Sequence, residues 1–578
     1  MRAFFLIAIL TALSFNVACT SKGQADETCQ AGDVWLRVNQ AGYTPEREKV
    51  AIVLSDTDIA GRSWRLMSGK KVVLSGKLGA ARQGDNYHVA QAFNFTIDFS
   101  KVKQIGNFTL ELAGAETVQV RILNDPYSLF AAQALMHLRA MRSGCDTRFN
   151  KAGHLGDSAA VVHVVKGDFR EGAWKEAVPR RTLNMSGGHY DAGDYIKFTL
   201  TQAYLAWQLL TAYNENPALF DRAKNEFDSD LLDEAKWSLD YLAKTFPDNN
   251  TFVIQVADKD DHKWDVRGNI RMPDEDVLDG KRPALCALAR SQMGSTAAAL
   301  ALGAHVFEKL DAEASAKYKE KAKAIYARAR LDDTQPSAFE RDITNDFYHD
   351  TSYVDNMALA AAELYRLTKL QNYLDDAVAY SPEVAPKTSW IHWFGFANHL
   401  MANLGDEAAK GRILEEVAQY EQDNLWNSSG DFYTWGTLHN WIGMANAHLR
   451  AKRDFKGETQ LTSPFSGTLD YVFGRNNWGI AMFASPDLPY CIQNVYSQIY
   501  TLTKAFPVGA ISPGPAGREW HEPMRQWMSY SEDNPFVKFD TEAVVFNDDS
   551  GDFVIQETTL TIQGDIILML ALAAKQTK

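Results

Sequence analysis

Two patterns of hydrophobic and polar residues divide the chain. Between residues 33 and 123, apolar and polar residues alternate, most clearly over residues 108–112 and 118–122. Alternation with a period of two is expected of strands that bury one face. Turn residues separate roughly seven such runs, so residues 29–125 are predicted to form a β-sandwich.

The pattern becomes helical after the boundary at Asp125-Pro126, with apolar residues three or four positions apart. One such face consists of Phe130, Ala134, Leu138 and Met141. Roughly a dozen comparable segments follow, and no β-rich block stands out among them. Residues 126–578 are therefore predicted to form an all-α domain.

The composition of the chain narrows the classes of molecule that it is expected to bind. The chain has 578 residues, a net charge of −14, 46% hydrophobic and 23% charged residues. This length favours two domains, and the proportions are ordinary for globular proteins. The negative charge disfavours nucleic acid and anionic membrane surfaces as partners, but it does not oppose a neutral glycan.

The N-terminus has the features of an export signal. Arg2 precedes the apolar run 3–13, and Cys19 follows Ala18. Residues 1–28 are predicted to be a signal peptide and tether, with Cys19 as a lipid-attachment site in a sequence similar to a bacterial lipobox. The expected location is the bacterial cell envelope, as a periplasmic protein or an outer-membrane lipoprotein, or outside the cell.

The remaining cysteines are widely spaced, so they do not form a Cys-x-x-Cys metal site. They are Cys29, Cys145, Cys286 and Cys491. Disulfide pairing and buried free thiols both remain open.

The stretch 186–198 holds the first candidate chemistry. Asp191 and Asp194 lie three residues apart among glycines and aromatic residues. Two like charges this close repel each other, which suits a site that activates water or holds a cation. The alternative is a solvated turn at the start of a helix.

A second acidic stretch covers residues 546–557. Acceptor-rich residues up to Asp552 give way to Glu557 in an apolar, β-branched setting. Burial of a carboxyl raises its pKa, a property that a general acid needs near neutral pH. An acidic calcium loop and a helix-capping glutamate are the alternatives.

Both stretches resemble signatures of glycoside hydrolase family 9, the cellulase-like inverting enzymes. The segment 187–198 matches the Gly-Gly-Trp-Tyr-Asp-Ala-Gly-Asp-Tyr-x-Lys-Phe motif, with His189 in place of tryptophan. The spacing of Phe546, Asp548, Phe553 and Glu557 matches the second signature. In addition, residues 37–53 look like the start of the immunoglobulin-like domain that precedes many catalytic domains of this family.

The resemblance implies a fold and a set of roles. The helical domain would be an (α/α)6 barrel. Glu557 would be the general acid, Asp194 the base and Asp191 a residue that orients the water, with Asp548 in support. Tyr190 and His189 would contact substrate. No cofactor or metal would be required for the reaction, and structural calcium is left open.

The substrate-contacting parts depart from the family pattern. The family's His-x-Arg is missing, and residues 488–494 stand in its place. His521 is a candidate replacement, although a histidine with ordinary structural partners is the commoner case. Residues 489–492 or the tail 520–546 are expected to close one end of the cleft.

Tryptophans in the second half are candidate surfaces for stacking on sugar rings, and two or three of them are expected to line a cleft. They are Trp390, Trp393, Trp426, Trp435, Trp441, Trp478, Trp520 and Trp527.

The sequence therefore favours an inverting hydrolase of β-1,4-linked glucan or gluco-oligosaccharides, and it makes no prediction of the oligomeric state. One alternative is an exo-acting β-glucosidase or glucosaminidase on short, chitosan-type oligomers. The other is a non-catalytic glycan-binding lipoprotein. The three acidic residues Asp191, Asp194 and Glu557 oppose the latter, because a binding module has no need of all three.

Overall fold

The structure is a computed structural model, and it describes residues 34–83, 88–144, 153–166, 174–258, 261–262, 264, 266, 281–330, 347–348, 352–385, 393–420, 425–426, 432–455, 466–531 and 533–575. Cys19, Cys29, Cys145 and Trp390 lie outside these ranges. Cys286 and Cys491 are buried free thiols. Within the described part, no helix is both long and apolar enough to span a bilayer.

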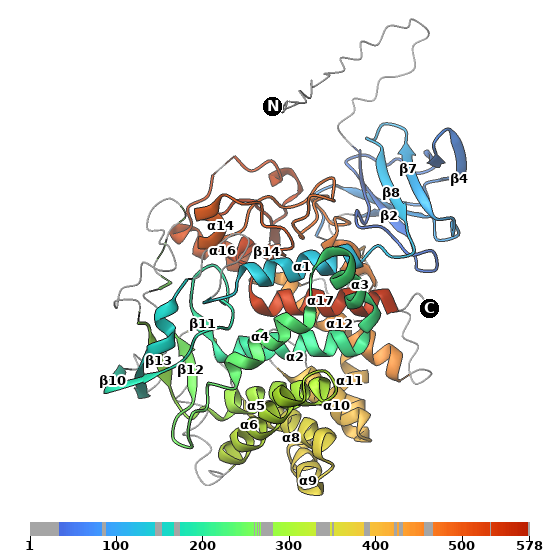
Figure 1. Ribbon diagram of the computed structural model, residues 1–578. Coiled ribbons are helices and arrows are strands. Elements are labelled where there is room, and N and C mark those ends of the chain that lie inside the picture. The colour runs from blue at the N-terminus through green and yellow to red at the C-terminus, as the bar shows by residue number, and fades with distance from the viewer. Residues whose placement is uncertain are drawn as a thin grey trace, which may run out of the picture.

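The N-terminal domain is the predicted β-sandwich (Figure 1). Its two sheets have the strand orders β1-β2-β6-β5 and β4-β3-β7-β8. The alternation read from the sequence corresponds to the packing, because Phe108, Leu110 and Leu112 are buried while the side chains between them are not. The strands are β1 (Val34–Arg37), β2 (Val50–Ser55), β3 (Ser63–Ser68), β4 (Lys71–Lys77), β5 (Arg82–Gln83), β6 (Phe93–Asp98), β7 (Gly106–Leu112) and β8 (Val118–Ile122).

The second domain is a ring of helical hairpins. Six helices form the ring, and each packs against the next in the order α2, α5, α8, α10, α12 and α17. The last of them, α17, packs against α2 and closes the ring. The helices α1, α4, α6, α9, α11 and α13 pack outside, each against one of these. This arrangement is the (α/α)6 barrel that the resemblance implied.

The bounds of the ring helices are α2 (Thr199–Glu215), α5 (Arg290–Phe307), α8 (Val354–Thr368), α10 (Phe394–Asn403), α12 (Thr437–Asp454) and α17 (Leu560–Lys575). The outer helices are α1 (Ser128–Ala140), α4 (Leu231–Leu242), α6 (Ala312–Arg330), α9 (Gln371–Tyr380), α11 (Glu407–Tyr420) and α13 (Ser466–Val472). The remaining α-helices are α3 (Pro217–Phe227), α14 (Gln498–Thr503), α15 (Arg518–His521) and α16 (Phe553–Gln556).

Small residues explain how the inner helices pack. Nearly every residue of α2 and α5 is buried, as expected of a helix surrounded by other helices. In α5, a Cβ added at Gly294 would lie 2.9 Å from the backbone carbon of Asn356 in α8, and one at Gly303 would lie 2.7 Å from Leu239 in α4. These glycines therefore allow neighbouring helices to approach closely.

The helical domain also contains strands, which the hydrophobic pattern of the sequence did not indicate. It contains a five-stranded sheet of order β10-β9-β13-β12-β11. The strands are β9 (Ala160–Lys166), β10 (Trp174–Leu183), β11 (Lys197–Phe198), β12 (Val253–Val256) and β13 (Pro283–Cys286). Most of these strands are too short to show a period of two, and partners such as β9 and β13 lie far apart in the sequence.

The two domains meet through the segment 37–53, which had suggested the immunoglobulin-like domain. Asn39 donates to Asp470 Oδ1 at 2.7 Å, and Arg47 forms an ion pair with the same oxygen at 2.6 Å. The backbone N–H of Gln40 donates to Phe473 O at 2.9 Å. Only five residues separate the last strand of the sandwich, which ends at Ile122, from α1, which begins at Ser128. The sandwich therefore sits directly on the helical domain.

Candidate active site

The segment 187–198 forms a loop that leads into β11 and then α2. Asp194 Oδ1 accepts from the N–H of Ile196 at 2.8 Å, and the N–H of Asp191 donates to Ile196 O at 3.0 Å. These bonds fold the loop back on itself. Both carboxylates are consequently buried, with Asp191 2% and Asp194 5% exposed.

Three buried charged side chains hold this loop in place. The side chains of Asp157, Lys197 and Arg282 are fully buried. Arg282 binds both oxygens of Asp157, at 2.9 and 2.7 Å, and Lys197 Nζ lies 2.6 Å from Oδ2. Lys197 also donates to Met185 O and Gly187 O at 2.8 and 2.9 Å, which fixes the backbone just before the two aspartates.

The segment that carries Glu557 is joined directly to this loop. The N–H of Leu560 donates to Asp191 O at 2.9 Å, and the N–H of Gly193 donates to Glu557 Oε1 at 3.1 Å. A Cβ added at Gly193 would lie 2.8 Å from the same oxygen. Glycine is therefore needed here, because any side chain would displace the glutamate.

The pKa values of two of the carboxyls are shifted strongly upward. Burial raises the pKa of Glu557 to about 7, against the charge of His262, which lowers it. Burial likewise raises the pKa of Asp191 to about 7, against hydrogen bonds that include one from Tyr348. Glu557 is thus held protonated at mildly acidic pH, while its surroundings remain polar enough to let it give up the proton.

Asp194 has a cationic partner. Its Oδ2 lies 2.7 Å from Nδ1 of His262. Burial alone would lower the pKa of this histidine, but the hydrogen bond and charge of Asp194, aided by Glu557, raise it to about 9. His262 is therefore charged at neutral pH.

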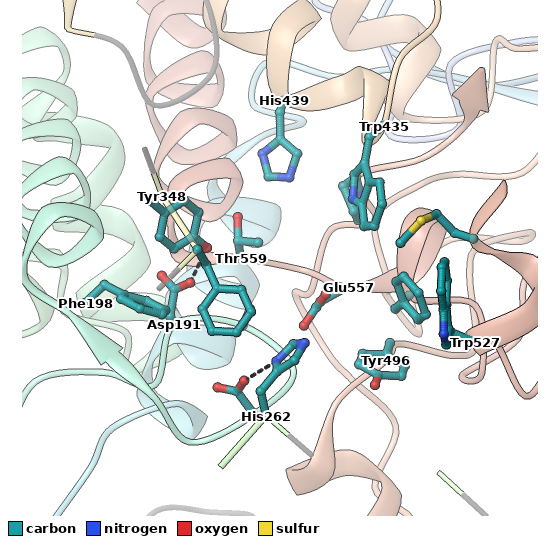
Figure 2. A pocket seen from close by; sticks show the side chains of 16 residues that line it. Asp191, Phe198, His262, Tyr348, Trp435, His439, Tyr496, Trp527, Glu557 and Thr559 are labelled. Atoms are coloured by element: carbon teal, nitrogen blue, oxygen red, sulfur yellow. Dashed lines mark hydrogen bonds and ion pairs between the residues drawn. The ribbon is translucent and has the colours of Figure 1, made fainter. Parts of the chain in front are cut away.

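These side chains line one cavity of about 530 Å³. Figure 2 shows Asp191, Phe198 and Tyr348 at one side, Glu557 near the middle, and Trp435, Tyr496 and Trp527 at the other. The carboxylates that the sequence singled out at 191, 194 and 557 thus share a single cavity, although the third lies more than 360 residues from the others.

Comparisons with known proteins agree with this geometry. The profile of glycosyl hydrolase family 9 matches residues 127–570. The chain belongs to this family. A cellulase N-terminal Ig-like domain profile matches residues 31–117.

Relatives within the family are distant. Endoglucanase C of Cellulomonas fimi is 26% identical over 494 residues, covering 76% of this chain and 43% of that protein. Endoglucanase 4 of a Bacillus species is 33% identical over 342 residues, covering 56% of this chain and 47% of that protein. The chain spans about half the length of these two curated relatives.

Two further relatives match over nearly their whole length. A xyloglucan-specific endo-β-1,4-glucanase of Bacteroides ovatus is 24% identical over 570 residues, covering 89% of this chain and 91% of that protein. The crystal structure of a metagenome-derived family 9 endoglucanase superposes with a TM-score of 0.75 at 20% identity, covering 94% and 99% of the two chains. This likeness supports the fold.

The expectation that His189 and Tyr190 contact substrate needs correction. Both side chains are fully buried and neither lines the cavity. His189 lies 3.1 Å from both Ser238 and Glu234, in the position where the family motif has tryptophan. Tyr190 bonds to His154 at 2.9 Å. Both residues therefore support the loop from behind.

Asp548 holds the segment that replaces the family's His-x-Arg. Its carboxylate accepts from the backbone N–H groups of Gln493 and Asn494 at 2.9 and 3.1 Å. Burial raises its pKa to about 6. Neither Asp548 nor residues 489–494 line the cavity, so this segment does not close it.

His521 does not replace the missing sugar contact either. It is buried, and its Nε2 lies 2.8 Å from Asp552. Among the predicted tryptophans, Trp435 and Trp527 line the cavity, whereas Trp393, Trp426, Trp441 and Trp478 are buried in the core.

The sequence reasoning missed His262 and Tyr348. Each lies far from the recognised motifs, and a single histidine or tyrosine carries no spacing signal. Only the fold brings them beside Asp194 and Asp191, respectively. Among the described residues, no cluster of three histidine, cysteine, aspartate or glutamate side chains is suited to hold a metal ion.

The ion pair between His262 and Asp194 makes a testable prediction. His262 should titrate near pH 9 in the free protein, and Asp194→Asn should lower that pKa, because the desolvation of the imidazolium is then no longer offset by the charge of Asp194. Histidine NMR titration measures both values, with His262→Asn to assign the resonance. His305, which lies on α5 away from the cavity, is the internal control. Titration of wild-type His262 near its ordinary pKa of 6.5 would contradict the pairing.

Proposed function

We propose that this protein is an inverting glycoside hydrolase that cleaves β-1,4-linked glucan or gluco-oligosaccharides. One observation carries the proposal: a single cavity holds Asp194, paired with a cationic histidine, together with Glu557, whose pKa burial raises to about 7. One carboxyl is thus set to accept a proton while the other is set to give one.

In the proposed reaction, Glu557 gives its proton to the glycosidic oxygen as the bond from that oxygen to the anomeric carbon breaks. A water attacks the anomeric carbon from the opposite face, and Asp194 accepts the proton that this water loses. The products are a hemiacetal of inverted configuration and a free hydroxyl on the leaving sugar. Proton exchange with solvent then restores both carboxyls.

Asp191 and Tyr348 are assigned to hold the water. The hydroxyl of Tyr348 donates to Asp191 Oδ2, and Asp191 is buried near Asp194 in the same loop. Asp191 lines the cavity, and a carboxyl in that position has capacity to bind a water molecule. This arrangement would orient the water toward the anomeric carbon, with Asp194 left to accept the proton.

The side chains that line the cavity favour a neutral sugar as the substrate. Aromatic side chains such as Trp435, Tyr496 and Phe553 offer faces on which the apolar faces of β-linked sugars stack. Recognition of a glucosamine ammonium would need a carboxylate beyond the three catalytic ones. The described part of the lining has none, which favours glucose-based substrates over chitosan-type oligomers.

Export to the cell envelope, with a lipid anchor at Cys19, is part of the proposal and rests on the N-terminal sequence alone. A neutral glycan outside the cytoplasm is compatible with the net charge of −14.

Substitution of the acid and the base tests the mechanism. Asp194→Asn and Glu557→Gln should each lower kcat on cello-oligosaccharides by at least ~100-fold while substrate binding is retained, since general acid–base groups typically contribute this much. Glu542→Gln is the matched control, because this side chain is exposed and does not line the cavity. Full activity of either active-site variant would contradict the assignment.

A second test concerns chain length. The tail between residues 520 and 546 does reach the cavity, through Met524 and Trp527. We expect this wall to favour oligosaccharides of two to six sugars over polymer. Reducing-sugar release from both substrates, measured beside the viscosity of carboxymethylcellulose, checks this. A rapid fall in viscosity with little reducing sugar would show internal cleavage of the polymer instead.

A further inference from the structure

The segment after α15 forms a wall beside the catalytic acid. It begins with the 3-10 helix η5 (Glu522–Trp527) and continues to residue 540. Met524 and Trp527 both line the cavity. The segment lies between the parts of the chain that resemble family motifs, so the motifs say nothing of its role.

This wall is fastened to the part of the chain that carries Glu557. The N–H of Ser529 donates to Gly551 O at 3.2 Å, and the N–H of Ser531 donates to Asp549 Oδ2 at 3.0 Å. His521 Nε2 lies 2.8 Å from Asp552 Oδ2. The side chain of Asp552 also caps α16, the short helix that ends one residue before Glu557. These bonds therefore fix the position of the wall relative to Glu557.

Trp527 is distinct from the other large aromatic side chains of the cavity. It is 64% exposed, whereas Tyr496 is 9% exposed and packs on Trp264 and Phe553. An exposed indole at the mouth of a cavity leaves a large apolar face in contact with water. A bound sugar ring would cover that face, which makes it a candidate binding surface.

The geometry also places Trp527 relative to the reacting bond. In an inverting reaction the water and the leaving sugar lie on opposite sides of the anomeric carbon, and the acid lies beside the leaving oxygen. In Figure 2, Glu557 lies between Trp527 on one side and Asp191 on the other. Trp527 is therefore on the side of the leaving sugar.

We propose that Trp527 is the stacking surface for the sugar on the leaving-group side of the cleaved bond, and that it sets the preference for substrates with at least one sugar there. This inference rests on the proposed hydrolysis and adds the position and orientation of the substrate. The residue acts in binding, since the indole N–H serves as a hydrogen-bond donor and not as an acid or a base.

Two substrates separate this role from a general structural one. Cellotetraose requires contacts on both sides of the cleaved bond. β-Cellobiosyl fluoride has fluoride as its leaving group, so it places no sugar beside Trp527. Trp527→Ala and Trp527→Phe are compared on both substrates. Trp520→Ala is the matched control, because Trp520 lies in the same region, is 48% exposed and does not line the cavity.

Trp527→Ala should lower kcat/KM for cellotetraose by about 10-fold, mainly through a higher KM, and Trp527→Phe should recover most of the loss because it restores a flat aromatic face. In both Trp527 variants, kcat/KM for β-cellobiosyl fluoride should change by less than about twofold. In Trp520→Ala, kcat/KM for both substrates should also change by less than about twofold. An equal loss on both substrates, or no loss on cellotetraose, would overturn the inference. Failure of the wild-type protein to hydrolyse either substrate would instead overturn the proposed function.

Discussion

The active site depends on the burial of three carboxyl groups in one cavity and on the groups that make this burial tolerable. Asp191, Asp194 and Glu557 repel one another when ionised, and burial raises the energetic cost of each charge. Each carboxyl has a different hydrogen-bond partner: a tyrosine hydroxyl for Asp191, an imidazolium for Asp194 and a backbone N–H for Glu557. These unlike partners make the three groups chemically different from one another.

The remaining architecture serves to keep this loop in place. The buried group of Asp157, Lys197 and Arg282 ties the loop to the small sheet, because Asp157 precedes β9 and Lys197 begins β11. Breaking such a fully buried arrangement by removing one partner is costly, since the others would be left without compensation. On the opposite side, Leu560 at the start of α17 bonds to the loop backbone. The helical ring thus positions Glu557 against Asp194.

The sequence was informative where chemistry and spacing coincide in a short stretch. The two aspartates and Glu557 lie in motifs whose glycines and aromatic residues have structural reasons, as the close approach of Glu557 to Gly193 shows. Residues that act through tertiary contacts were not predictable in this way. His262 and Tyr348 are isolated in the sequence, and their roles arise only from folding.

The errors have a related origin. His189 and Tyr190 lie beside Asp191 and Asp194 in the sequence, but their side chains are buried behind the loop, so adjacency in the sequence did not mean access to the cavity. The short strands of the catalytic domain were missed because their pairing joins segments far apart, and the two-residue β11 has no pattern of its own.

The central claim is that the carboxyls act from opposite sides of one glycosidic bond, with water between the base and the sugar. The most direct measurement is the configuration of the first product, followed by proton NMR during hydrolysis of a cello-oligosaccharide. Because water attacks the face opposite the leaving sugar, the account predicts that the α-anomer forms first and that the β-anomer grows only by mutarotation. A first product in the β-configuration would contradict the account.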